Sequence, residues 1–168
     1  MASNESAAIA GMRAYLGAQS TFHRVNRYEK DPAELVYANV DDSTGTGYPD
    51  LFEVHYDGTP TADAIKLIDL AFANADTDGQ DRDKAGYVFQ DVVDQDIGGV
   101  YDYSSDCGLS GMPTQYNRTG LHIFVVDLTG TVYKKEASAV EAVTTGDAVT
   151  AITVYPDTTT DNWIPVSD

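Results

Sequence analysis

The opening stretch of the chain, residues 4–28, limits the possible folds more than any other part of the sequence. Its apolar side chains recur at helical spacing and fall within one arc of about 140° on a helical wheel. These side chains are Ala8, Ile9, Met12, Tyr15, Leu16 and Phe22. Polar or small residues fall opposite them: Ser6, Arg13, Gly17, Ser20 and Arg24. The pattern predicts a long amphipathic helix with Ser3 or Asn4 as its cap and Glu5 in its first turn.

Such a helix needs a surface to pack against. Gly11 and Gly17 each weaken it by about 1 kcal/mol relative to alanine, so burial of its apolar face has to stabilise it. Later parts of the chain carry strand patterns that could supply this surface. We therefore expect an α+β fold in which a long N-terminal helix packs on an antiparallel sheet.

The strand patterns begin near Gly86. Residues 121–127 give the strongest one, with apolar side chains on both faces, and residues 127–132 read as a hairpin turn. Residues 87–89 and 149–155 are further expected strands, whereas glycines and Pro113 indicate a loop over residues 108–117. Residues 137–143 read as a helical turn or a loop.

The middle and the end of the chain are less regular. A second helical pattern starts at Thr61, after a loop rich in Asp, Ser, Thr and Gly. The last residues, 156–168, read as an acidic tail in which Trp163 can fold back. We expect a single domain over 1–168: helix 4–28, irregular helix-and-loop region 29–85, and antiparallel sheet with C-terminal tail 86–168.

The charge balance excludes some partners. The chain has 27 acidic and 10 basic residues, a net charge of −17. A nucleic-acid partner for this domain alone is disfavoured, because phosphate binding needs a basic surface. An anionic membrane surface is disfavoured for the same reason. The charge itself indicates either solubility through self-repulsion or cation binding.

The single cysteine, Cys107, rules out an intrachain disulfide and a thiolate zinc cluster. Its surroundings are acidic, which disfavours a reactive thiolate, so we interpret it as a packing or loop residue. No run of 18 apolar residues is present that could span a membrane.

Three blocks of sequence together resemble the type IV pilins and related pseudopilins. Residues 4–19, NESAAIAGMRAYLGAQ, are similar to the part of the pilin helix that follows its membrane-embedded half. Residues 67–69, LID, and 85–89, AGYVF, resemble the middle block of the family. Residues 120–132, GLHIFVVDLTGTV, resemble its later strand and turn. Residues 134–168 match no family pattern.

The resemblance implies a structural subunit of a type IV pilus or a related filament: a major or minor pilin, or a type II secretion pseudopilin. Its partners would be other pilin subunits, bound through the N-terminal helix, and an inner-membrane assembly platform. The protein would be anchored in the inner membrane before assembly and then lie in an extracellular or periplasmic filament, with adhesion as one use. The family's leader, its methylated apolar helix start and its C-terminal cysteine pair are not in this sequence, and we expect an upstream segment to carry the first two.

The acidic segment 76–83, DTDGQDRD, is the best candidate metal site. Asp76, Asp78, Asp81 and Asp83 place carboxylates around Gly79, and carboxylate oxygens are ligands that Ca²⁺ prefers. The spacing departs from an EF-hand loop. The segment is therefore read either as a Ca²⁺ site or as a solvated turn.

No catalytic constellation appears in the sequence, so we expect a protein that is not an enzyme. The histidines, His23, His55 and His122, lie far apart among apolar or aromatic neighbours and read as packed or edge residues. The alternative to a filament subunit is a secreted or periplasmic module that binds a cation or another ligand.

Overall fold

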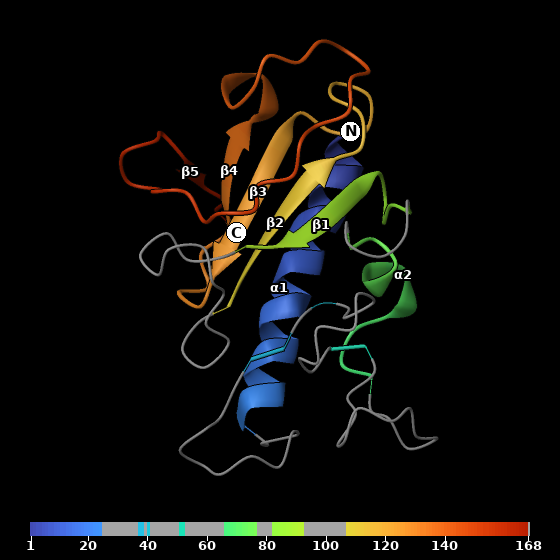
Figure 1. Cartoon of the computed structure of the whole chain (residues 1–168), viewed down its shortest axis with the longest axis vertical. Coiled ribbons are helices and arrows are strands. Elements are labelled where there is room, and N and C mark those ends of the chain that lie inside the picture. The colour runs from blue at the N-terminus through green and yellow to red at the C-terminus, as the bar shows by residue number, and fades with distance from the viewer. Residues whose placement is uncertain are drawn as a thin grey trace.

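The computed structural model describes residues 1–24, 37–38, 40, 51–52, 66–76, 82–92 and 107–167. Its elements are α1 (Ala2–Arg24), α2 (Leu70–Ala73), β1 (Tyr87–Asp91), β2 (Gly108–Pro113), β3 (His122–Asp127), β4 (Tyr133–Glu136), the 3-10 turn η2 (Ala137–Ala139) and β5 (Ile164–Pro165). Within the described residues the strands form a five-stranded antiparallel sheet in the order β1-β2-β3-β4-β5. The predicted α+β class is confirmed (Figure 1).

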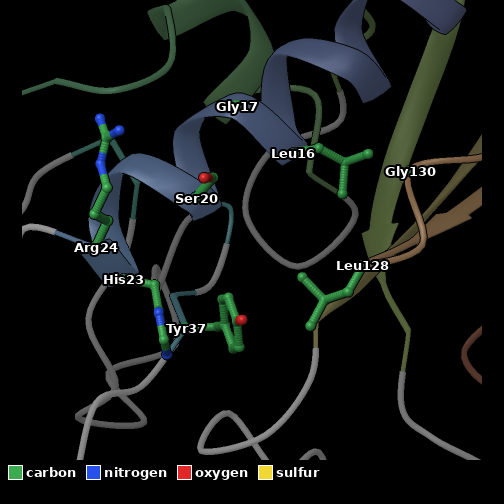
Figure 2. A pocket seen from close by; sticks show the side chains of 8 residues that line it. All are labelled: Leu16, Gly17, Ser20, His23, Arg24, Tyr37, Leu128 and Gly130. Carbon is green, nitrogen blue, oxygen red and sulfur yellow. The ribbon is translucent and has the colours of Figure 1, made fainter.

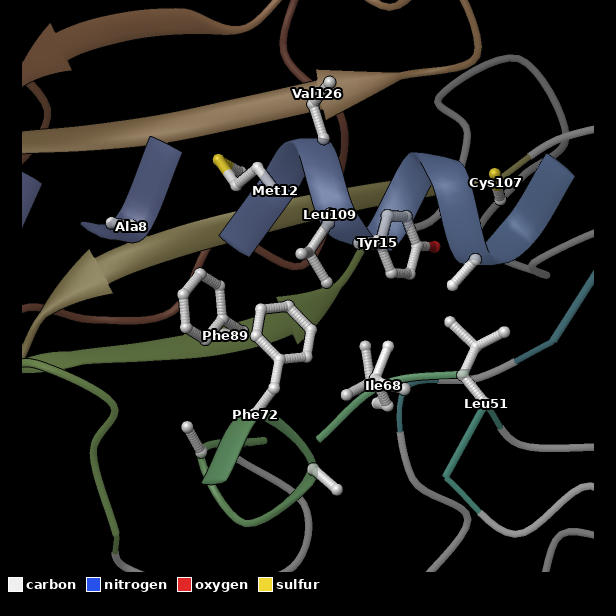
Figure 3. Close-up of a cluster of buried hydrophobic side chains, with 14 of the residues drawn as sticks. Ala8, Met12, Tyr15, Leu51, Ile68, Phe72, Phe89, Cys107, Leu109 and Val126 are labelled. Carbon is white, nitrogen blue, oxygen red and sulfur yellow. The ribbon is translucent and has the colours of Figure 1, made fainter. Parts of the chain in front are cut away.

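Helix α1 lies along one face of the sheet, as predicted (Figure 1). Of the apolar arc, Ala8, Met12, Tyr15 and Phe22 are buried, and Ile9 and Leu16 are partly buried. Figure 3 shows this core with α1 running across the view: Met12 and Tyr15 approach Leu109 of β2, and the Phe72 and Phe89 rings lie below them in this view. The helix prediction is confirmed up to Arg24, and its last residues, 25–28, lie outside the described part.

The predicted cap of α1 is wrong. The helix begins at Ala2, so Ser3 and Asn4 lie inside its first turn. The backbone oxygen of Met1 accepts the N–H groups of Asn4 and Glu5, at 2.9 and 3.0 Å. The side chain of Asn4 is used elsewhere: its Nδ2 donates to the backbone oxygen of Thr119 at 3.0 Å. A tertiary contact has therefore replaced the local one.

Strand β3 contributes to both sides of the sheet, which confirms the two-faced apolar pattern. Phe124 and Val126 join the core under α1. Ile123 and Val125 join a second cluster on the opposite face, together with Met112 of β2. The C-terminal segment covers that second face, passing in front of the sheet in Figure 1 while α1 lies behind it. The sheet is thus buried between α1 and the C-terminal segment.

The loop predicted over residues 108–117 is wrong for its first half. Gly108–Pro113 is strand β2, and all six of its residues are buried. The glycines of β2 are needed because neighbouring side chains pack closely against them, and not because the chain turns there. A Cβ at Gly108 would lie 2.8 Å from Val92, and one at Gly111 would lie 3.1 Å from the Phe89 ring. These close contacts with Phe89 of β1 and with Val92 explain why the sequence of β2 contains glycines that are typical of a loop.

The strand predicted over residues 149–155 is also wrong. This segment forms none of the named strands and instead crosses the outer face of the sheet. The hydroxyl of Ser110 donates to the backbone oxygen of Ile152 at 2.7 Å, which ties the segment to β2 through a side chain. The edge of β4 is taken by β5, from the tail that we expected to fold back. That fold-back is confirmed, and Trp163 is buried.

The turn between β3 and β4 follows the hairpin prediction. Gly130 has φ of 84°, and Asp127 Oδ1 accepts the N–H of Thr129 at 2.9 Å. Residues 137–139 form a 3-10 turn. Of the two alternatives predicted for residues 137–143, a helical turn or a loop, the helical turn is therefore confirmed at its start. Of the helical pattern that starts at Thr61, the structure describes only the end, where Asp69 caps the short α2 through the N–H of Phe72 at 2.8 Å.

Candidate functional site

A regular stripe of exposed residues runs along α1 on the side away from the sheet. Its members are Ser3, Ser6, Ala10, Arg13, Gly17, Ser20 and Arg24. Their spacing alternates between three and four residues, which is the repeat of a helix–helix seam. Apart from the two arginines, the side chains are small, and small side chains let helix axes approach closely. We call these seven residues the α1 stripe.

The first turn of α1 is fixed to the start of β3. Oε1 of Glu5 accepts the N–H of Leu121 at 2.9 Å and lies 3.1 Å from Nδ1 of His122. Burial raises the pKa of the Glu5 carboxyl, but the hydrogen bonds from Leu121 and His122 and the attraction of the imidazole outweigh it. The pKa of Glu5 is therefore below its ordinary value.

The second half of α1 is fixed by polar contacts too. The side-chain amide of Gln19, which is fully buried, donates to the backbone oxygen of Ala38 and accepts its N–H at 3.0 Å. The hydroxyl of Tyr15 lies 3.2 Å from Oδ1 of Asp91 in β1. Since both halves of the helix are tied down by its buried face, the α1 stripe is presented on a fixed support.

A cleft of 430 Å³ opens beside the C-terminal end of α1. Its lining residues are Leu16, Gly17, Ser20, His23 and Arg24 of α1, with Tyr37, Leu128 and Gly130. The His23 ring stacks on the Tyr37 ring, with centroids 4.5 Å apart and planes 13° from parallel. Figure 2 shows Leu128 of the β3–β4 turn opposite Tyr37, with Leu16 beside it, whereas the Arg24 side chain extends away from Tyr37 and Leu128.

The comparisons with known proteins identify a family. The family model described as "Protein of unknown function (DUF2950)" matches residues 1–162. The chain belongs to the DUF2950 family. Neither the search of curated proteins nor the search of solved structures gave a match.

The structure of this DUF2950 chain describes two of the four aspartates of the predicted metal site. Asp76 is buried, and its backbone pairs with Phe89 of β1. Asp83 is exposed, and its Oδ1 accepts the N–H of Gly86 at 2.6 Å. Asp78 and Asp81 lie outside the described residues. No group of three or more His, Cys, Asp or Glu side chains suited to a metal occurs in the described part, and calcium binding by the whole segment stays a prediction.

The structure also describes the cysteine and two of the three histidines considered in the DUF2950 sequence. Cys107 is buried in the core under α1, which confirms the packing reading. His122 lies at the edge of the helix–sheet junction and His23 lines the cleft, whereas His55 falls outside the described residues. Within the described ranges, none of the helices has the length and apolar character needed to cross a bilayer.

Sequence reasoning found one part of this site and missed the other. The polar arc of the helical wheel already contained Ser6, Arg13, Gly17, Ser20 and Arg24, and their regular spacing was visible in the sequence. The cleft was missed because Leu128 lies far from α1 in the chain and Tyr37 lies beyond the helix end, so no local sequence pattern joins them to α1. A signal that would have indicated it is the exposed leucine within the turn 127–132, where an apolar side chain has no local role.

Proposed function

We propose that this DUF2950 chain is a structural, non-enzymatic subunit of a filament of the type IV pilin kind, either a pilin or a type II secretion pseudopilin. In this proposal α1 packs against the α1 helices of neighbouring subunits, and the sheet with its C-terminal cover faces outward. The subunit is handled by an inner-membrane assembly platform and ends in a filament at the cell surface or in the periplasm. The observation that carries the proposal is the α1 stripe.

The chemistry of the α1 stripe supports packing between like chains. The chain as a whole carries a net charge of −17, so two copies repel each other over most of their surface. The stripe contains no carboxylate and two arginines, Arg13 and Arg24. A helix bundle built along it therefore brings together an exposed surface of α1 that carries no acidic side chain.

Cross-linking tests the proposed packing. The full-length protein is produced in its own cells with Ala10→Cys, which places a thiol on the α1 stripe. Thr153→Cys is the matched control, because Thr153 is exposed on the segment that covers the opposite face of the sheet. The native Cys107 is buried and interferes with neither variant. We expect ladders of covalent oligomers in sheared filaments for Ala10→Cys and only monomers for Thr153→Cys.

The opposite pattern, or filaments that show no cross-link through α1, contradicts the proposal. The gene gives a second test that needs no variant. We expect the gene to encode, upstream of residues 1–168, a prepilin leader and an apolar stretch of about 20 residues, long enough to cross a bilayer. A cleavable secretion signal alone in that place would instead identify a secreted binding module.

A further inference from the structure

We draw no further inference here: the strongest candidate, the cleft between the end of α1, Tyr37 and the β3–β4 turn, has an exposed apolar side chain in Leu128, but nothing in the described part of the chain shows what covers it.

Discussion

Glu5 in the first turn of α1 and His122 at the start of β3 are within hydrogen-bonding distance, with Oε1 and Nδ1 3.1 Å apart. The same carboxylate oxygen accepts the N–H of Leu121 at 2.9 Å. The two elements are more than 110 residues apart in sequence, so this contact joins the N-terminal end of the helix to a central strand. Asn4 adds a second link by donating to the backbone of Thr119. The position of α1 on the sheet is therefore set by side chains of its first turn.

The Glu5 contact makes stability depend on pH. The pKa of Glu5 is below its ordinary value of 4.5 in the folded chain, so its ionised form is favoured by folding. Its contribution is fully present above pH 4.5 and is lost as the pH falls through the folded-state pKa. We expect Glu5→Gln to lower the free energy of unfolding by about 1 kcal/mol at pH 7, and the difference from wild type to shrink below pH 4.

Urea unfolding at pH 7, 5 and 3.5 measures this effect. Asp161→Asn serves as the control for removing one carboxylate, because Asp161 is exposed on the C-terminal segment, and its offset from wild type at pH 7 should be smaller than that of Glu5→Gln. If the Glu5→Gln offset is constant from pH 7 to 3.5, the carboxylate does not provide the link described above.

The two glycines of α1 should respond oppositely to the same substitution. Gly11→Ala places a methyl group 2.9 Å from the Phe72 ring, whereas Gly17→Ala places one in open space. Alanine favours the helix by about 1 kcal/mol at either position, but overpacking at Gly11 costs about 1–3 kcal/mol. We expect Gly17→Ala to raise the melting temperature and Gly11→Ala to leave it unchanged or lower it. An equal rise for both variants would show that Phe72 does not pack against Gly11.

The buried amide of Gln19 should be hard to replace. Its side chain is fully buried and pairs with both backbone groups of Ala38. Gln19→Leu keeps the volume but leaves a buried N–H and a buried C=O unpaired, at about 1–3 kcal/mol each. We expect a loss of about 2–6 kcal/mol in urea unfolding. Gln115→Leu, at an exposed position, is the matched control and should cost less than about 0.5 kcal/mol; equal effects would contradict the pairing.

The sequence predicts best the elements whose signal is local. The spacing of apolar residues in α1 and the two-faced pattern of residues 121–127 each describe one element, and the structure confirms both. Strand β2 could not be predicted, because its glycines are explained by Val92 and Phe89, which reach it from elsewhere in the chain. Residues 149–155 have a strand pattern, but their apolar side chains cover the outer face of the sheet. The edge of β4, where such a strand could pair, is occupied by β5.

The candidate site divides in the same way. The α1 stripe follows from helical geometry alone, once the apolar arc of the helix is known. The cleft needs Tyr37 and Leu128 to meet the end of α1, and that meeting depends on how the β3–β4 turn sits beside the helix. Glu5 illustrates this limit of prediction from the sequence. Its place in the first turn of α1 could be predicted, but its contact with His122, which is distant in the chain, could not.

The C-terminal tail should be part of the cooperative fold. Trp163 is 7% exposed, packs in the cluster on the outer face of the sheet, and lies with its ring 5.9 Å from Nζ of Lys135. Ile164, the next residue, is 59% exposed. We expect Trp163→Ala to lower the free energy of unfolding by about 3 kcal/mol and Ile164→Ala by less than about 0.5 kcal/mol, both followed by circular dichroism. Equally small losses would mean that the tail is not needed to bury the outer face of β3, because the sheet would then unfold with the same free energy whether or not Trp163 covers it.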